Sequence, residues 1–260
     1  IKPDKTIIAL VGNPNTGKST LFNRITGTRS AVGNIAGITI EACSAPGIIS
    51  GSENWEFVDL PGIYNLHAQT EDGRVTEDAL INPGGKWNPN VILLIADKST
   101  LQGQVFLALQ IRELEIPCIL LLNRMNYETV DPQLCGILEK GLGIPVREIQ
   151  ALKDDPADWV NMLSPLLHQP TVCSILRKVP ESIEESLKIL NAVMPYGTLG
   201  YLCHLARMNH APSWLNEEEK RAWEKARSQS TVSPAGLQLE EAGQRMSIVR
   251  DLLSQAGKPV

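Results

Sequence analysis

One short stretch near the start of the chain combines the residue types that grip phosphate. Residues 12–19 read Gly-Asn-Pro-Asn-Thr-Gly-Lys-Ser, which fits the order GxxxxGK[ST] at every fixed position. The glycines let backbone N–H groups turn inward around phosphates, Lys18 brings a cation to them, and the Ser19 hydroxyl can bind Mg2+. This order predicts a P-loop if a strand precedes it and a helix follows. The residues expected to contact a nucleotide here are Asn13, Asn15, Thr16, Gly17, Lys18, Ser19 and Thr20.

A second motif, Asp59-Leu60-Pro61-Gly62, follows at the end of a strand-like run. Its carboxylate can hold Mg2+ through water, and the N–H of Gly62 can meet a γ-phosphate. Between the two motifs lies a glycine-containing loop in which Thr39 is expected to close onto Mg2+ and the γ-phosphate as a first switch. We therefore expect Lys18, Thr39 and Gly62 to serve catalysis, and Ser19, Thr39 and Asp59 to hold Mg2+.

Ile63 follows Gly62, at the position where many GTPases carry a glutamine that orients the attacking water. A hydrophobic side chain cannot position water. Either another group or a bound cation supplies that help, or hydrolysis is slow.

The base-reading motif expected after a later strand is NKxD, and the chain has Asn123-Arg124-Met125-Asn126 there. A carboxylate at the last position accepts two hydrogen bonds from guanine, whereas Asn126 has one acceptor and turns a donor toward a donor. The mismatch costs ~2 to 4 kcal/mol, enough to erase much of the preference for guanine. Xanthine would suit Asn126 better, and adenine is an alternative. Arg124 can still lay its stem and guanidinium plane along a base.

A last base contact is expected in a loop that reads Gln150-Ala151-Leu152-Lys153, where an SAK-like sequence is usual. The N–H of Ala151 could meet the base oxygen O6. Gln150 replaces the serine, so a hydroxyl that shapes the loop is missing. We count Gln150, Ala151 and Leu152 among the nucleotide-binding residues.

These motifs follow short apolar runs, each of which ends in a polar loop. We predict strands at 6–11, 55–60, 91–96, 118–122 and 146–149, and helices at 18–25 and 101–114. Alternation of strands and helices implies right-handed crossovers and a mainly parallel sheet with helices on both faces. Ligands of such sheets bind at the carboxyl ends of strands, where the unusual polar residues fall. The fold class is therefore α/β, of the P-loop NTPase type.

Strand signals stop after about residue 168, and helix-length segments at 180–193, 200–209, 215–227 and 234–253 follow. We predict a P-loop domain over residues 1–168 and a small all-helical domain over residues 169–260. The helical part has no catalytic motif of its own.

Composition narrows the function classes. The 260 residues are 43% hydrophobic and 5% aromatic and carry a net charge of -5, without a basic run that would attract nucleic acid. The five cysteines and four histidines show no metal-ligand spacing, so reduced thiols are expected. No apolar run approaches the about 20 residues that cross a bilayer, and the chain as given is expected to be soluble.

With these motifs placed, residues 6 to about 155 resemble the G domain of the ferrous iron transport protein B family of bacterial membrane transporters. The resemblance rests on residues 12–23, on Val32-Gly33-Asn34 with Gly37-Ile38-Thr39, and on residues 59–64. It implies GTP binding and hydrolysis coupled to Fe2+ import by a membrane domain outside this chain, on the cytoplasmic side of the inner membrane. It also implies a K+ ion held by Asn15 with the backbone carbonyls of Gly33 and Ile35, which would replace the missing glutamine. A helical domain follows the G domain in that family.

Three functions stay open at this point. The first is a GTP hydrolase, with ATP as an alternative nucleotide and a homo-oligomer as an alternative assembly. The second, suggested by Ile63 and Asn126, is a nucleotide-binding switch with negligible turnover. The third is an RNA- or ribosome-associated GTPase, against which the acidic charge argues.

Overall fold

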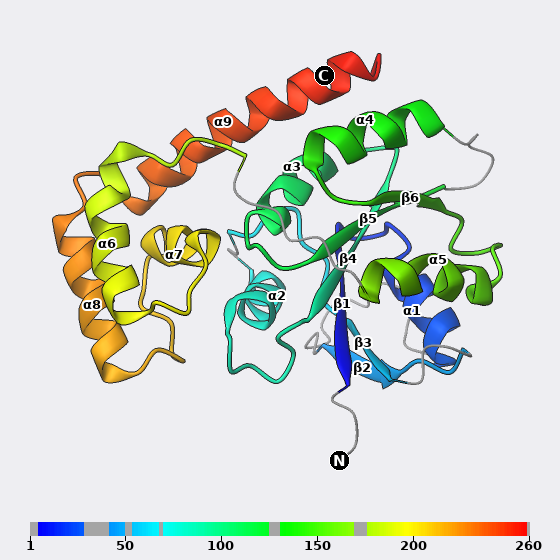
Figure 1. Ribbon diagram of the computed structural model, residues 1–260, viewed down its shortest axis with the longest axis horizontal. Helices are drawn as coiled ribbons and strands as arrows, with labels where there is room; N and C mark the ends of the chain where they lie inside the picture. The colour runs from blue at the N-terminus through cyan, green and yellow to red at the C-terminus, as the bar shows by residue number, and fades with distance from the viewer. Residues whose placement is uncertain are drawn as a thin grey trace.

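A single six-stranded sheet forms the centre of the part that carries the motifs (Figure 1). The computed structural model describes residues 5–28, 42–49, 54–67, 70–124, 131–168 and 176–258. The strand order is β2-β3-β1-β4-β5-β6, and every neighbouring pair is parallel except β2 with β3. The predicted mainly parallel α/β sheet is confirmed. The strands are β1 (Thr6–Gly12), β2 (Cys43–Pro46), β3 (Trp55–Asp59), β4 (Val91–Asp97), β5 (Cys118–Asn123) and β6 (Val146–Ile149).

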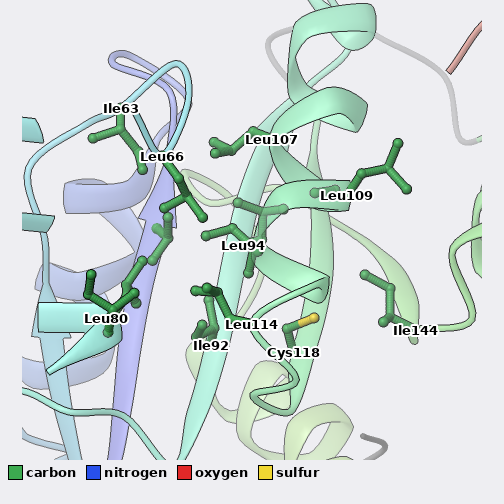
Figure 2. Packing of buried hydrophobic residues seen from close by; sticks show 14 of the residues in the cluster. Ile63, Leu66, Leu80, Ile92, Leu94, Leu107, Leu109, Leu114, Cys118 and Ile144 are labelled. Carbon is green, nitrogen blue, oxygen red and sulfur yellow. The ribbon is translucent and has the colours of Figure 1, made fainter. Parts of the chain in front are cut away.

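The inner strands are apolar because helices cover both faces of the sheet. Every residue of β4 and β5 is buried, as expected for parallel strands between two helical layers. Successive residues alternate between two apolar clusters: Ile8 and Leu10 of β1 face one, and Ala9 and Val11 face the other. The first cluster is closed by α1 (Lys18–Thr26) and α5 (Pro156–His168), and the second by α2 (Glu71–Ile81), α3 (Leu101–Arg112) and α4 (Pro132–Leu142). Figure 2 shows part of the second cluster, which includes Leu80, Ile92, Leu94 and Leu107.

The C-terminal helices pack against this second face. The expected helical segments are present as η1 (Glu181–Ile183), α6 (Glu184–Val193), α7 (Leu199–Ala206), α8 (Glu217–Gln229) and α9 (Pro234–Gln255). Helix α9 runs across α3 and α4 (Figure 1), and Leu252 and Leu253 join the same apolar cluster as Leu94 and Leu138. The apolar core is therefore continuous from the sheet into the helical part. Within the described ranges, none of the helices is long and apolar enough to cross a membrane.

Buried ion pairs add a polar contact between the two parts. Glu113 follows α3, and its carboxylate accepts hydrogen bonds from Arg245 of α9 (2.6 Å to Nη2) and Arg177 (3.0 Å to Nε). Gly200 lets α7 approach the same point, because a Cβ there would lie 1.5 Å from the Glu113 carbonyl oxygen. The helical part thus packs against the end of α3 and forms ion pairs with it.

Candidate functional site

The phosphate-binding motif lies where the sequence predicts it, between β1 and α1. Gly12 packs so closely against β4 that a Cβ would lie 2.2 Å from the carbonyl oxygen of Ile95. The loop is braced internally, since the Thr16 hydroxyl donates to the Asn13 carbonyl at 3.0 Å. Asn15 is exposed and adopts the left-handed conformation (φ 67°), which asparagine tolerates better than most residues. Gly17 is the N-cap of α1, and Lys18 and Ser19 begin that helix, where backbone N–H groups favour an anion.

The two phosphate-side motifs meet through one ion pair. Lys18 Nζ donates to Asp59 Oδ1 at 2.8 Å, and the two side chains are only 10% and 11% exposed. The parallel pairing of β1 with β3 places Leu10 opposite Asp59, so both motifs leave the sheet at the same edge. Gly62 then passes close to the P-loop, because a Cβ at that position would lie 2.9 Å from the backbone nitrogen of Pro14. Lys18, Asp59 and Gly62 are thereby brought together around one point.

Ile63 turns away from this point. Its side chain is 4% exposed and belongs to the apolar cluster shown in Figure 2, and its N–H donates to the Gly12 carbonyl at 3.1 Å. The neighbouring segment is fixed from α2 and α3, since Thr76 donates to the Pro61 carbonyl (2.8 Å) and Gln110 accepts from the Leu66 N–H (3.1 Å). Ile63 is therefore a core residue.

On the base side, Asn123 joins the P-loop to the loop after β6. Its Nδ2 donates to the Thr16 carbonyl at 2.8 Å, and its Oδ1 accepts from the Ala151 N–H at 2.9 Å. Gly17 allows this contact, because a Cβ there would lie 2.3 Å from Asn123 Nδ2. The Ala151 N–H expected to meet a base is therefore engaged by Asn123 in the described structure. Arg124 follows at the end of β5, where its N–H donates to the Ile149 carbonyl at 2.8 Å.

The loop at residues 150–154, here called the base loop, is shaped by a residue that sequence reasoning missed. The Asp154 carboxylate accepts from the Gln150 N–H at 2.5 Å and from Trp159 Nε1 at 3.4 Å. The Gln150 carbonyl in turn accepts from the N–H groups of Lys153 and Asp154, both at 2.9 Å. This contact runs back to a residue four positions earlier, unlike the usual turn in which an aspartate accepts from a residue two positions later, so the sequence carries no clear signal for it. Asp154 shapes this loop, in which the usual serine is absent.

Arg24, also missed, reaches the base loop from the last turn of α1. Its Nη1 donates to the Ala151 carbonyl at 2.7 Å, and its guanidinium lies 4.9 Å from the centroid of the Trp159 ring. Ala151 is 1% exposed, whereas Leu152 beside it is 72% exposed. The spacing of residues in the sequence does not predict a contact between Arg24 and Ala151, which lie far apart in the chain.

Some predicted site residues lie outside the described residues: Gly33, Ile35, Thr39 and Asn126. Of the described ones, Asp59 and Ser19 offer a carboxylate and a hydroxyl, oxygen donors of the kind that Mg2+ prefers. Within the part of the chain that the structure describes, no group of three or more His, Cys, Asp or Glu residues could hold a metal on its own.

The sheet order, the P-loop between β1 and α1, and the Asp59 motif beside it define the fold of a P-loop GTPase. The family model for ferrous iron transport protein B matches residues 6–162. The chain belongs to the ferrous iron transport protein B family and comprises its N-terminal G domain.

Individual relatives agree with this assignment. The chain is 39% identical over 153 residues to the Fe(2+) transporter FeoB of Synechocystis, with 58% of this chain and 24% of that protein covered. It is 33% identical over 198 residues to FeoB of Escherichia coli K12, with 69% and 25% covered. The chain thus spans about a quarter of the length of these relatives.

Solved structures show the same fold. The cytosolic domain of the T. maritima FeoB iron transporter in a GDP form matches with a TM-score of 0.69 at 21% identity, covering 96% of this chain and 98% of that one. The N-terminal domain of FeoB from S. thermophilus, bound to GDP.AlF4- and K+, matches with a TM-score of 0.67 at 22% identity, covering 95% and 98%. Both likenesses extend over the helical part as well as the sheet.

Proposed function

We propose that this chain is the GTP-hydrolysing module of an Fe2+ transporter and acts from the cytoplasmic side of the inner membrane on a membrane transport domain. The observation that carries the proposal is the 2.8 Å contact between Lys18 and Asp59, which joins the P-loop to the DxxG motif. Buried Lys–Asp pairs that hold only structure are common. Here, however, the pair lies at the carboxyl ends of β1 and β3 and at the N-terminus of a helix, which is where α/β proteins bind phosphate.

The phosphate-side roles follow from the groups present. Lys18 neutralises the outer phosphates, Ser19 and Asp59 hold Mg2+ with Thr39, and the Gly62 N–H donates to the γ-phosphate. With phosphates bound, Lys18 would exchange its contact with Asp59 for phosphate oxygens. The Asp59 carboxylate would then be available to hold Mg2+. Bound Mg2+ supplies neutralisation of the charge that develops on the phosphates.

We further propose that K+ assists at Asn15, with the carbonyls of Gly33 and Ile35 as partners. Asn15 is exposed on the P-loop, and its amide oxygen is a suitable donor for a hard cation. The S. thermophilus relative is bound to K+ together with GDP.AlF4-. The burial of Ile63 supports a role for such a cation, because position 63 offers nothing to the attacking water.

For the base, we propose a relaxed preference between GTP and ATP that originates at Asn126. Arg124 would flank the base, and Ala151 would offer its N–H to O6 while sharing it with Asn123. Gln150 and Leu152 of the base loop would border the same site. Nucleic acid is not expected as a partner, because the net charge is -5.

Phosphate release tests the proposal directly. Turnover of GTP would be measured with Mg2+ in K+ and in Na+ buffers, for the unaltered chain, for Lys18→Ala, and for Lys220→Ala on the surface of α8 as a control. We expect K+-stimulated release that Lys18→Ala abolishes and Lys220→Ala leaves intact. Nucleotide binding without K+-stimulated release would favour a binding switch instead, and tight salt-sensitive RNA binding would contradict both.

A further inference from the structure

The base loop and the P-loop leave strands that are not neighbours in the sheet, yet their relative position decides where a base can sit. It follows β6, whereas the P-loop follows β1, and β4 and β5 lie between those strands in the sheet. Two side chains from other elements hold the base loop in place, and both end on the backbone of Ala151. Asn123 holds the N–H of Ala151, and Arg24 holds its carbonyl.

Arg24 is well placed to transmit the position of the phosphate site. It lies in the last turn of α1, the helix whose first residues are Lys18 and Ser19. A helix is a rigid connector, so the Cα of Arg24 keeps a fixed distance from the phosphate-binding end. Its hydrogen bond to Ala151 is short, 2.7 Å, and charge-assisted.

Helix α5 holds the Arg24 guanidinium and the base loop from the other side. The Trp159 ring is 2% exposed and lies 4.9 Å below the Arg24 guanidinium, an arrangement that favours a cation. The same ring directs Nε1 toward Asp154, which closes the base loop on Gln150. Arg24 is therefore held in one orientation by a buried ring instead of being free to swing into solvent.

We propose that Arg24 is a positioning residue that fixes the base loop relative to the P-loop and thereby sets how long a nucleoside diphosphate stays bound. The inference rests on the proposed function, because it assumes a nucleotide whose phosphates lie at Lys18 and whose base lies at Ala151. The guanidinium of Arg24 contacts the Ala151 carbonyl and the Trp159 ring, on the base side of the proposed site. Its loss would loosen the base side while leaving the phosphate-side groups in place.

The test compares Arg24→Gln with Arg24→Lys, with Trp159→Phe and with Arg221→Gln, a control on the exposed side of α8. Glutamine is a good helix former, so α1 should persist. Release of a fluorescent GDP analogue, chased by excess GDP, gives the dissociation rate. We expect it to rise about tenfold in Arg24→Gln, the change that corresponds to one lost hydrogen bond from a charged donor. The dissociation rate of Arg24→Lys should lie between those of the unaltered chain and Arg24→Gln. Trp159→Phe should raise the rate by less than Arg24→Gln does, and Arg221→Gln should match the unaltered chain.

Two further readouts separate positioning from a general loss of structure. In GTP turnover the KM of Arg24→Gln should rise by more than kcat falls, whereas a damaged fold would lower kcat and the melting temperature together. Without nucleotide, the amides of residues 151–154 should exchange hydrogen faster in Arg24→Gln than in the unaltered chain, while those of β1 should not.

The outcomes distinguish this inference from the proposed function. If the unaltered chain binds GDP but Arg24→Gln releases it within twofold of the same rate, Arg24 is not a positioning residue. If the unaltered chain binds no guanine nucleotide, the proposed function fails, and the exchange of residues 151–154 still decides whether Arg24 fixes the loop. Equal exchange in both proteins overturns the inference.

Discussion

The buried carboxylate of Glu113 allows the strongest stability prediction. Glu113 accepts hydrogen bonds from Arg245 and Arg177. Glu241 accepts hydrogen bonds from Arg207 and Arg245 and forms an ion pair with Arg177. All five side chains are at most 3% exposed, so three positive charges face two negative ones away from water. Glu113→Gln would leave three cations facing a single carboxylate. Breaking a buried pair by removing one charge costs about 3–5 kcal/mol.

We expect the lower end of that range, about 3 kcal/mol, because glutamine keeps an oxygen that can accept one of the hydrogen bonds. For a chain of this size the melting temperature should fall by roughly 6 to 12 °C. Thermal and urea unfolding followed by circular dichroism would measure the change. Glu181→Gln is the matched control, since Glu181 pairs with Lys178 on the exposed surface and its loss should not be detectable. A drop for Glu113→Gln no larger than that of the control would refute the reasoning.

The pH dependence gives a second measure of the same group. Burial by itself raises the pKa of Glu113, but Arg245, Arg177 and Arg207 outweigh it and hold that pKa below its ordinary value of 4.5. A depressed carboxyl pKa stabilises the fold above the ordinary value, and this contribution is lost as the pH falls through the lower, folded value. The gap in melting temperature between the unaltered chain and Glu113→Gln should therefore be full at neutral pH and narrow below about pH 4. A difference in melting temperature that stays constant with pH would show that the charge of Glu113 is not the cause of the destabilisation.

Three further predictions concern the site. Gly17→Ala should abolish nucleotide binding measured by calorimetry, because the φ of 93° and the 2.3 Å approach to Asn123 Nδ2 leave no room for a methyl group. Ile63→Gln should lower the free energy of unfolding by about 2–4 kcal/mol in urea titrations without raising GTP turnover, since the amide would enter an apolar core. Faster turnover in that variant would contradict the placement. Asn126→Asp should raise the ratio of GTP to ATP affinity by about tenfold or more in competition titrations, and a large GTP preference in the unaltered chain would refute this.

The features that sequence predicted well are those that local pattern controls. The strands were readable because each buried run ends at a polar or glycine residue, as β1 does at Gly12 and β5 at Asn123. Strand β2 was missed, since its four residues are mostly exposed at the sheet edge and include a proline. Helices α2, α4 and α5 were also left unassigned, and the first two contain glycine while α5 contains Pro165. The glycines and the proline argue locally against a helix, whereas packing on the sheet stabilises all three helices.

The contacts that sequence could not give are those between distant segments. The motif residues themselves were identified from spacing, and the structure places Lys18, Asp59 and Gly62 around one point. Arg24 carries no motif, and its partner is 127 positions along the chain. The pairing of Glu113 with Arg245 spans 132 positions. Such pairs depend on how α1 and α9 pack, which periodicity within one element does not specify.

The position of Ile63 changes the question of catalytic help. From sequence, this residue is a missing glutamine, which suggests that one substitution could restore a water-positioning group. In the structure the backbone donates to Gly12 and the side chain fills the core beside Leu66, so the direction of the side chain is set by the chain path. A glutamine at 63 would have to leave the core, and the segment from Pro61 to Leu66 would have to move with it, against the contacts from Thr76 and Gln110. The help with hydrolysis that the proposed function requires would therefore come from a group other than residue 63, and Asn15 is exposed on the P-loop.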